Sequence, residues 1–242
     1  MERFLTGFET IGILEIDLAQ PCTLTPTLTR MRERVPQMTP YKNQIRIIGG
    51  THKRRLIRFP DMLGVESFRP TPDRVRETLF NWLGQNLDGK RCLDAFSGSG
   101  ALAFEAASRG AAKVIAVENS KAAMQAITKN ANVLDMSNLK LINADAFGFL
   151  AATPEKFDVI FIDPPFAQDW WARLAPLIAR VAAPEALVYC EYVKELKDRD
   201  LPGFTRTRQA RAGVVNYHLF QPIAAPTAET CAPAASGNAE EN

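Results

Sequence analysis

The sequence contains few residues of the kinds that build metal sites and disulfide frameworks. Its 242 residues include 2 histidines and 4 cysteines, and no two cysteines form a Cys-x-x-Cys pair. This composition disfavours structural zinc and is typical of proteins of the reducing cytoplasm, where thiols stay free. We therefore expect no metal and a cytoplasmic location. Cys92 and Cys190 lie within apolar runs, which predicts that both are buried in strands.

A long uncharged apolar run is also missing. A membrane span needs roughly 18 or more consecutive apolar residues, whereas the apolar segment at 11–18 is interrupted by Glu15 and Asp17. We expect neither a membrane helix nor a signal peptide. With 46% hydrophobic residues, the chain can bury one sizeable core, as expected of a globular protein.

The formal net charge is only +2, but the charges are unevenly distributed. Between residues 42 and 60 all charged side chains are basic, and after Gln221 all are acidic. A basic stretch beside a near-neutral body is typical of proteins that bind phosphate backbones, although a solvated charged hairpin is the alternative. The basic residues of this stretch are Lys42, Arg46, Lys53, Arg54, Arg55 and Arg58.

Four segments follow one another along the chain. Residues 1–40 show no sustained period and are expected to be a disordered leader or extension, within which Met31 and Met38 are candidate start positions. Residues 41–70 predict a small basic β-hairpin appendage, with strands at 45–48 and 56–59 joined by a glycine-started turn. Residues 71–222 form the main domain, and 223–242 are expected to be a disordered tail.

The main domain alternates between helix and strand periodicities. Thr71 followed by Pro72 predicts a helix N-terminus, with the helix extending to about Asn86. Such alternation predicts βαβ units and an α/β fold with a mainly parallel sheet. The last two strands have no helix between them, which predicts one antiparallel strand. The expected strands are 91–96, 113–118, 139–143, 157–163, 186–192, 205–211 and 214–220, and the expected helices are 101–109, 121–134, a short one near 147, and 170–181.

Acidic residues follow successive strands of this predicted sheet. Ligands of such sheets bind beyond the carboxyl ends of the strands, where the strand order reverses. The first strand leads into a glycine-rich turn with Gly98 and Gly100, and Glu118 lies where an acid can bind ribose hydroxyls. This pattern predicts an adenosine-containing cofactor. The acids in question are Asp94, Glu118, Asp145 and Asp163.

Asp94 distinguishes between two adenosine-containing cofactors, NAD and S-adenosylmethionine. The glycine string also matches the G-x-G-x-x-A pattern of NAD-binding proteins, which keeps an oxidoreductase open as an alternative. A carboxylate at the mouth of the loop repels a pyrophosphate but favours a ligand that carries an ammonium and a sulfonium. S-adenosylmethionine has both groups, and Asp145 is then suited to accept from the adenine amine.

The segment Asp163-Pro164-Pro165-Phe166 ends the fourth strand. Two consecutive prolines donate no backbone hydrogen bond and hold the chain stiffly, so this arm presents acceptors. Acceptors suit a donor-rich amine on a nucleobase, and Phe166 is placed to stack on that base. The alternative is an ordinary proline-rich turn.

Three strings extend the argument beyond chemistry. Residues 69–83, Arg-Pro-Thr-Pro-Asp-Arg-Val-Arg-Glu-Thr-Leu-Phe-Asn-Trp-Leu, together with 93–102 and Asp163-Pro164-Pro165-Phe166, closely resemble the RsmD family. Those proteins are bacterial enzymes that methylate the N2 amine of a guanine in 16S ribosomal RNA with S-adenosylmethionine. The resemblance spans about residues 44–222 and departs at Arg54, where the family usually has glycine, and at Pro72, where it usually has threonine.

The resemblance implies a Rossmann-like class I methyltransferase with seven strands, the last of them antiparallel. It implies 16S rRNA, in an assembled or assembling small subunit, as the substrate of a monomeric enzyme. Candidate catalytic residues are Asp163, Pro164, Pro165 and Phe166. Candidate cofactor residues are Asp94, Phe96, Ser97, Gly98, Gly100, Glu118, Asn119, Asp145 and Ala146. Candidate RNA-binding residues are Arg46, Lys53, Arg54, Arg55, Arg58, Arg69 and Arg74.

Other readings of the same residues stay open. Methyltransferases that act on DNA adenine or protein glutamine share the acceptor-Pro-Pro-aromatic arm. A non-catalytic RNA-binding module is a further alternative, which the intact set of four acids disfavours.

Overall fold

The computed structural model describes residues 43–59, 70–165 and 170–223, which all belong to one compact unit, 40–242. Two predicted site residues, Arg69 and Phe166, lie outside the described residues, as do the predicted leader and the tail from residue 224. No helix within the described ranges is long and apolar enough to cross a membrane.

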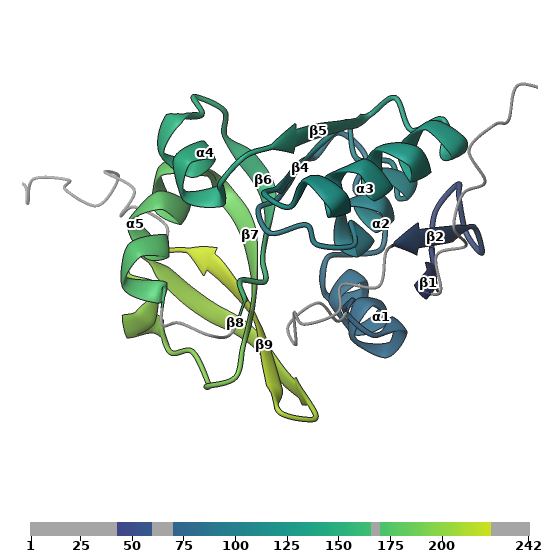
Figure 1. Cartoon of the computed structure of the whole chain (residues 1–242). Helices are drawn as coiled ribbons and strands as arrows, with labels where there is room; N and C mark the ends of the chain where they lie inside the picture. The colour runs from purple at the N-terminus through teal and green to yellow at the C-terminus, as the bar shows by residue number, and fades with distance from the viewer. Residues whose placement is uncertain (1–42, 60–69, 166–169, 224–242) are drawn as a thin grey trace, which may run out of the picture. The chain divides into compact units, whose positions relative to one another are not determined.

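A seven-stranded sheet in the order β5-β4-β3-β6-β7-β9-β8 organises this unit (Figure 1). Strands β3 to β7 are parallel, and β9 runs antiparallel to both of its neighbours. The predicted fold class is confirmed. Strand order reverses between β3 and β6, which is where such sheets bind ligands. The strands are β3 (Arg91–Asp94), β4 (Lys113–Glu118), β5 (Leu139–Asn143), β6 (Phe157–Ile162), β7 (Ala182–Tyr192), β8 (Phe204–Ala212) and β9 (Val215–Pro222).

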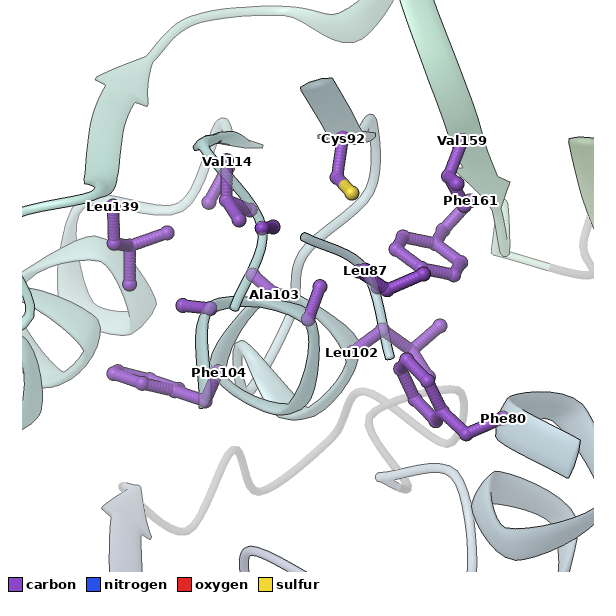
Figure 2. Close-up of a cluster of buried hydrophobic side chains, with 14 of the residues drawn as sticks. Phe80, Leu87, Cys92, Leu102, Ala103, Phe104, Val114, Leu139, Val159 and Phe161 are labelled. Carbon is purple, nitrogen blue, oxygen red and sulfur yellow. The ribbon is translucent and has the colours of Figure 1, made fainter. Parts of the chain in front are cut away.

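Helices cover both faces of the sheet. Helices α1 (Asp73–Trp82), α2 (Ala101–Ser108) and α3 (Lys121–Leu134) bury their apolar sides against one face. Helices α4 (Ala146–Ala152) and α5 (Trp171–Val181) pack on the other face. Figure 2 shows part of the first core, where side chains of α1 and α2 meet those of β3, β4 and β6. A 3-10 turn, η1 (Asp198–Asp200), precedes β8.

Helix α1 ends at Trp82, earlier than the predicted end near Asn86. The reason is local, because Gly84 and Gln85 have φ angles of 88° and 69° and cannot continue a right-handed helix. The N-terminus also differs from the prediction, since Pro72 rather than Thr71 is the N-cap and no side chain caps the helix. The Thr71 hydroxyl is thereby available for another partner.

The amino-terminal hairpin packs closely against the sheet's helices. Strands β1 (Asn43–Arg46) and β2 (Leu56–Phe59) pair antiparallel, and Ile47 and Ile57 are buried in the same core as α1 and α2. The glycine turn docks on the end of α2, where Ser108 accepts from Thr51 N at 2.8 Å through its carbonyl and donates to Gly49 O at 2.6 Å. A Cβ atom at Gly50 would overlap the Ser108 carbonyl, which explains the glycine.

Candidate functional site

A cavity of about 690 Å³ opens at the carboxyl ends of the central strands, beside the point where strand order reverses. Its lining comes from nearly every loop that follows a strand. We divide it into a first half, lined by residues 96–99, 117–120 and 144–146, and a second half, lined by 70–72, Glu191, 212–215 and Tyr217. Asp163, Pro164 and Pro165 lie at the end of β6, between the strands that supply the two halves.

The glycine-rich turn after β3 forms one wall of the first half. Gly98 and Gly100 have φ angles of 51° and 80°, in the left-handed region that glycine adopts without strain. Ser97, Gly98 and Ser99 line the cavity, whereas Gly100 lies behind them, packed so closely on Phe104 that a side chain would collide with its ring. Gly100 therefore shapes the turn rather than lining the cavity.

Glu118 ties two loops of the first half together. Its carboxylate oxygens accept hydrogen bonds from Gly98 N at 2.8 Å and from Ser120 N at 2.7 Å. These bonds fix the orientation of the carboxylate, and a carboxylate retains capacity to accept from ligand hydroxyls. Asn119, beside it, is exposed and lines the same wall.

Asp145 begins the next helix at the edge of the first half. The exposed side chain accepts from Gly148 N at 2.8 Å and so caps α4, and Ala146 is buried behind it. Three aromatic rings gather nearby, with ring centroids of Phe96 and Trp170 at 6.1 Å and of Phe147 and Trp170 at 5.0 Å. Of these, Phe96 and Trp170 line the cavity and give this end an apolar surface.

Asp94 is the most buried acid of the cavity, with 2% of its surface exposed. Burial raises the pKa of its carboxyl to about 7, and repulsion from Glu118 adds to this shift. A hydrogen bond from Ala103 N at 3.2 Å opposes the shift. Asp94 is thus poised to change its charge when a cation arrives.

Asp163 and Glu191 form a second acidic pair. Burial raises the pKa of each carboxyl, and for Asp163 repulsion from Glu191 and then from Asp94 raises it further. Glu191 Oε1 accepts from Tyr189 OH at 2.7 Å and from Thr71 Oγ1 at 3.2 Å. The Thr71 hydroxyl that does not cap α1 is used here.

The charges of the cavity fit the predicted cofactor. Five carboxyl side chains line it, and among the described lining residues there is no lysine, arginine or histidine. Such a site favours a ligand with an ammonium and a sulfonium and repels a pyrophosphate, which disfavours NAD. The roles expected for Glu118, toward ribose hydroxyls, and for Asp145, toward the adenine amine, stay predictions. The five acids are Asp94, Glu118, Asp145, Asp163 and Glu191.

The predicted RNA-binding residues are not part of the cavity. Within the described part of the chain, all of them are exposed on the hairpin or on α1, and none lines the cavity. Arg46 is already paired, since its Nε lies 2.8 Å from Asp73 Oδ2. Arg54 has a φ angle of 71°, so this arginine adopts the conformation that the family glycine would supply. The exposed members are Arg46, Lys53, Arg54, Arg55, Arg58 and Arg74.

Sequence reasoning missed the second half of the cavity. The local sequence predicts only a helix cap at Thr71 and gives no role to Glu191. The signal for Glu191 was present, because it is an acid close to the carboxyl end of the strand predicted at 186–192, like the four acids that were identified. The wall at Ala212–Val215 depends on how β9 inserts beside β7, which local patterns do not reveal.

Comparisons with known proteins agree with this geometry. The family model described as "Conserved hypothetical protein 95" matches residues 45–221. Ribosomal RNA small subunit methyltransferase D of Escherichia coli K12 is 40% identical over 181 residues, which are 74% of this chain and 90% of that protein. The protein of the same name from Haemophilus influenzae is 37% identical, over 74% of this chain and 95% of that one.

Solved structures give the same picture. The putative methyltransferase yhhF of E. coli superposes with a TM-score of 0.67 and 39% identity. The match covers 76% of this chain and all of that one. The two chains therefore share the same fold.

Proposed function

The chain belongs to the family described as conserved hypothetical protein 95, the RsmD family of S-adenosylmethionine-dependent methyltransferases, and we propose that it methylates the N2 amine of a guanine in 16S ribosomal RNA. The two curated relatives compared above are named for methylation of small-subunit ribosomal RNA. We further propose that the substrate is the RNA within an assembled or assembling small subunit and that the enzyme acts as a monomer.

The observation that carries this proposal is the position of Asp163 and Pro164. They lie at the end of β6, between the half of the cavity suited to the cofactor and the half that faces β7 and β9. An amine held by the Asp163 carboxyl and the Pro164 carbonyl therefore lies between the two halves. There a methyl donor bound in the first half can meet a nucleobase bound in the second half.

Both acceptors act on the nitrogen lone pair. The N2 lone pair of guanine is delocalised into the ring, so the amine must become more tetrahedral before it reacts. Hydrogen bonds from its two N–H groups to Asp163 and Pro164 orient the lone pair and stabilise the positive charge that grows on nitrogen. When bound, S-adenosylmethionine would supply a methyl group on a sulfonium, and its transfer to N2 would leave the electron pair of the broken S–CH₃ bond on sulfur. The proton of N2 then passes to Asp163 or to water.

The charge of Asp163 is coupled to its surroundings. Its pKa is raised by burial and by two neighbouring acids, so without a cation the carboxyl holds a proton more readily than an exposed aspartate. A sulfonium beside it favours the ionised form, which is the better acceptor. Asp163 thus becomes most effective when the first half of the cavity is filled.

The direct test uses small subunits and free 16S rRNA from a strain that lacks the enzyme. Incubation with methyl-labelled S-adenosylmethionine and mapping of the modified nucleotide examines cofactor, substrate and atom together. We expect label on N2 of one guanine and in the subunit more than in free RNA. Label on adenine, on protein or nowhere would refute the proposal.

A further inference from the structure

The second half of the cavity has a construction of its own. It is lined by Thr71, Tyr217, the turn Ala212–Val215 and the carboxyl of Glu191. Glu191 and Tyr217 belong to β7 and β9, whereas the cofactor half is lined by residues at or after the ends of β3, β4 and β5, and β6 with Asp163 lies between these strands in the sheet. This half therefore faces the amine acceptor from the side opposite the cofactor half, where the base to be methylated belongs.

Glu191 is the acid of this half and is held in a fixed orientation. Only 6% of its surface is exposed, and both of its hydrogen bonds, from Tyr189 OH and Thr71 Oγ1, reach the same oxygen, Oε1. Within the described residues Oε2 accepts no hydrogen bond. Burying a carboxyl group costs free energy unless its oxygens accept hydrogen bonds. Oε2 lies in a ligand cavity and can accept such a bond from a ligand.

Glu191 also lies beside Asp163. Ile162 and Cys190 are partners in the parallel pair β6–β7, so the residues that follow them, Asp163 and Glu191, are neighbours at the ends of adjacent strands. Adjacent strands lie about 4.8 Å apart. Their proximity has an electrostatic effect, because after burial, repulsion from Glu191 is the largest cause of the raised pKa of Asp163. The cavity thus presents two acidic acceptors side by side.

Two adjacent acceptors match one nucleobase edge in particular. The Watson–Crick edge of guanine carries two neighbouring donors, the N1–H and the N2 amine, whereas adenine offers one amine beside a bare nitrogen that accepts. We propose that Glu191 determines base specificity by accepting the N1–H of the guanine whose N2 amine is held by Asp163. This inference rests on the proposed function and assigns the residue that selects its substrate.

The competing explanation is that Glu191 only anchors Thr71 and so holds the start of α1. Both roles predict that removing the carboxylate lowers activity. They differ in base preference, because an anchor acts equally on every base that enters. If Glu191 instead accepts the N1–H, replacing its carboxylate must reduce the preference for guanine over bases that lack this donor.

The experiment compares two RNA substrates, with guanine or with 2-aminopurine at the target position. 2-Aminopurine keeps the N2 amine but carries an unprotonated N1, which would face Glu191 acceptor to acceptor. Sites built to hydrogen-bond a substrate group discriminate strongly against analogues that lack it, so we expect the wild type to prefer guanine by about 100-fold or more in kcat/KM. In Glu191→Gln the amide presents an NH₂ as well as an oxygen, and we expect this preference to fall by about tenfold or more.

The control is Glu195→Gln, an exposed glutamate that pairs with Arg206 and does not line the cavity. Its preference for guanine should equal that of the wild type. An undiminished preference in Glu191→Gln would overturn the inference while leaving the proposed function intact. If Glu191→Gln does not fold, the wild type decides, since a preference below about tenfold contradicts a selective N1–H contact. Failure of the wild type to methylate the guanine RNA would refute the proposed function itself.

Discussion

Asp163 shares its cavity with other carboxyl groups, and its role as acceptor gives the most direct prediction at the residue scale. Asp163→Ala should lower kcat about 100- to 1,000-fold, because one preorganised hydrogen bond to the developing charge is lost. The affinity for S-adenosylmethionine should stay within a few-fold, since the residues 96–99, 117–120 and 144–146 remain. Single-turnover methylation and equilibrium dialysis measure the two quantities separately. Near-normal turnover would show that the amine is not held by Asp163.

Arg54 is a residue in a backbone conformation suited to glycine. A non-glycine residue in the left-handed region costs about 1–2 kcal/mol, and the greater freedom of glycine in the unfolded chain offsets about half of this. Arg54→Gly should therefore raise the free energy of unfolding by about 0.5–1 kcal/mol, which corresponds to roughly 1–4 °C in Tm. Thermal unfolding by circular dichroism measures it.

The matched control for Arg54 is its neighbour. Arg55 carries the same charge on the same turn, but its φ angle is not positive. Arg55→Gly should destabilise the protein by about 0.5–1 kcal/mol through chain entropy alone. Equal changes in both variants would mean that the conformation of Arg54 carries no strain.

At the scale of elements, the β8–β9 turn forms one wall of the cavity and also reaches solvent. Val214 in this turn is 71% exposed and lines the cavity. Val214→Glu would place a negative charge where RNA must enter, so kcat/KM for RNA should fall about tenfold, with binding of S-adenosylmethionine unchanged. Val133→Glu on α3, where the valine is 73% exposed and lies outside the cavity lining, should leave both unchanged. Equal effects of the two substitutions would exclude a role for this turn in RNA entry.

The amino-terminal hairpin is the element that we propose to hold RNA phosphates. Arg54→Glu/Arg55→Glu should weaken RNA binding and flatten its salt dependence, because each phosphate contact contributes about −0.7 to −0.9 to the slope of log K against log salt. Binding titrations at several salt concentrations measure this slope. The same double charge reversal at Lys90 and Lys140, two exposed lysines outside the cavity lining, tests whether net charge alone is responsible. An unchanged slope in the hairpin variant would remove the hairpin from the RNA site.

Local patterns predicted elements far better than they predicted the cavity. The ranges of β4, α3 and β5 agree with the sequence-based ranges, because caps and apolar periodicity are local signals. The sequence also identified the acids at the carboxyl ends of β3, β4 and β6, because the end of a strand can be located from local patterns. The contact between Thr71 and Glu191 joins residues 120 positions apart, and no local pattern encodes it. The same is true of the Ala212–Val215 wall.

At the scale of the whole molecule, the buried acids of the cavity make both stability and cofactor binding depend on pH. The cavity concentrates carboxyl groups at or just after the ends of five adjacent strands, and burial raises the pKa of Asp94 to about 7. An unfolded aspartate titrates near 4. Between these values the folded protein binds more protons than the unfolded chain, so the contribution of Asp94 to stability falls as pH rises from about 4 to about 7.

Binding of a cationic cofactor opposes the effect of burial and lowers the pKa of the Asp94 carboxyl, because a nearby positive charge favours the ionised form. Binding of S-adenosylmethionine near or below pH 7 should therefore release protons, and its Kd should weaken by up to about tenfold per pH unit below 7. Calorimetry in buffers of different ionisation enthalpy counts the released protons. Asp94→Asn should bind more weakly at pH 8 and show a shallower pH dependence, with the remainder due to Asp163 and Glu191, whereas Asp158→Asn, outside the cavity, should keep the full dependence. A wild-type Kd that is constant between pH 5.5 and 8 would mean that the buried acids do not exchange protons for the positive charge of the cofactor.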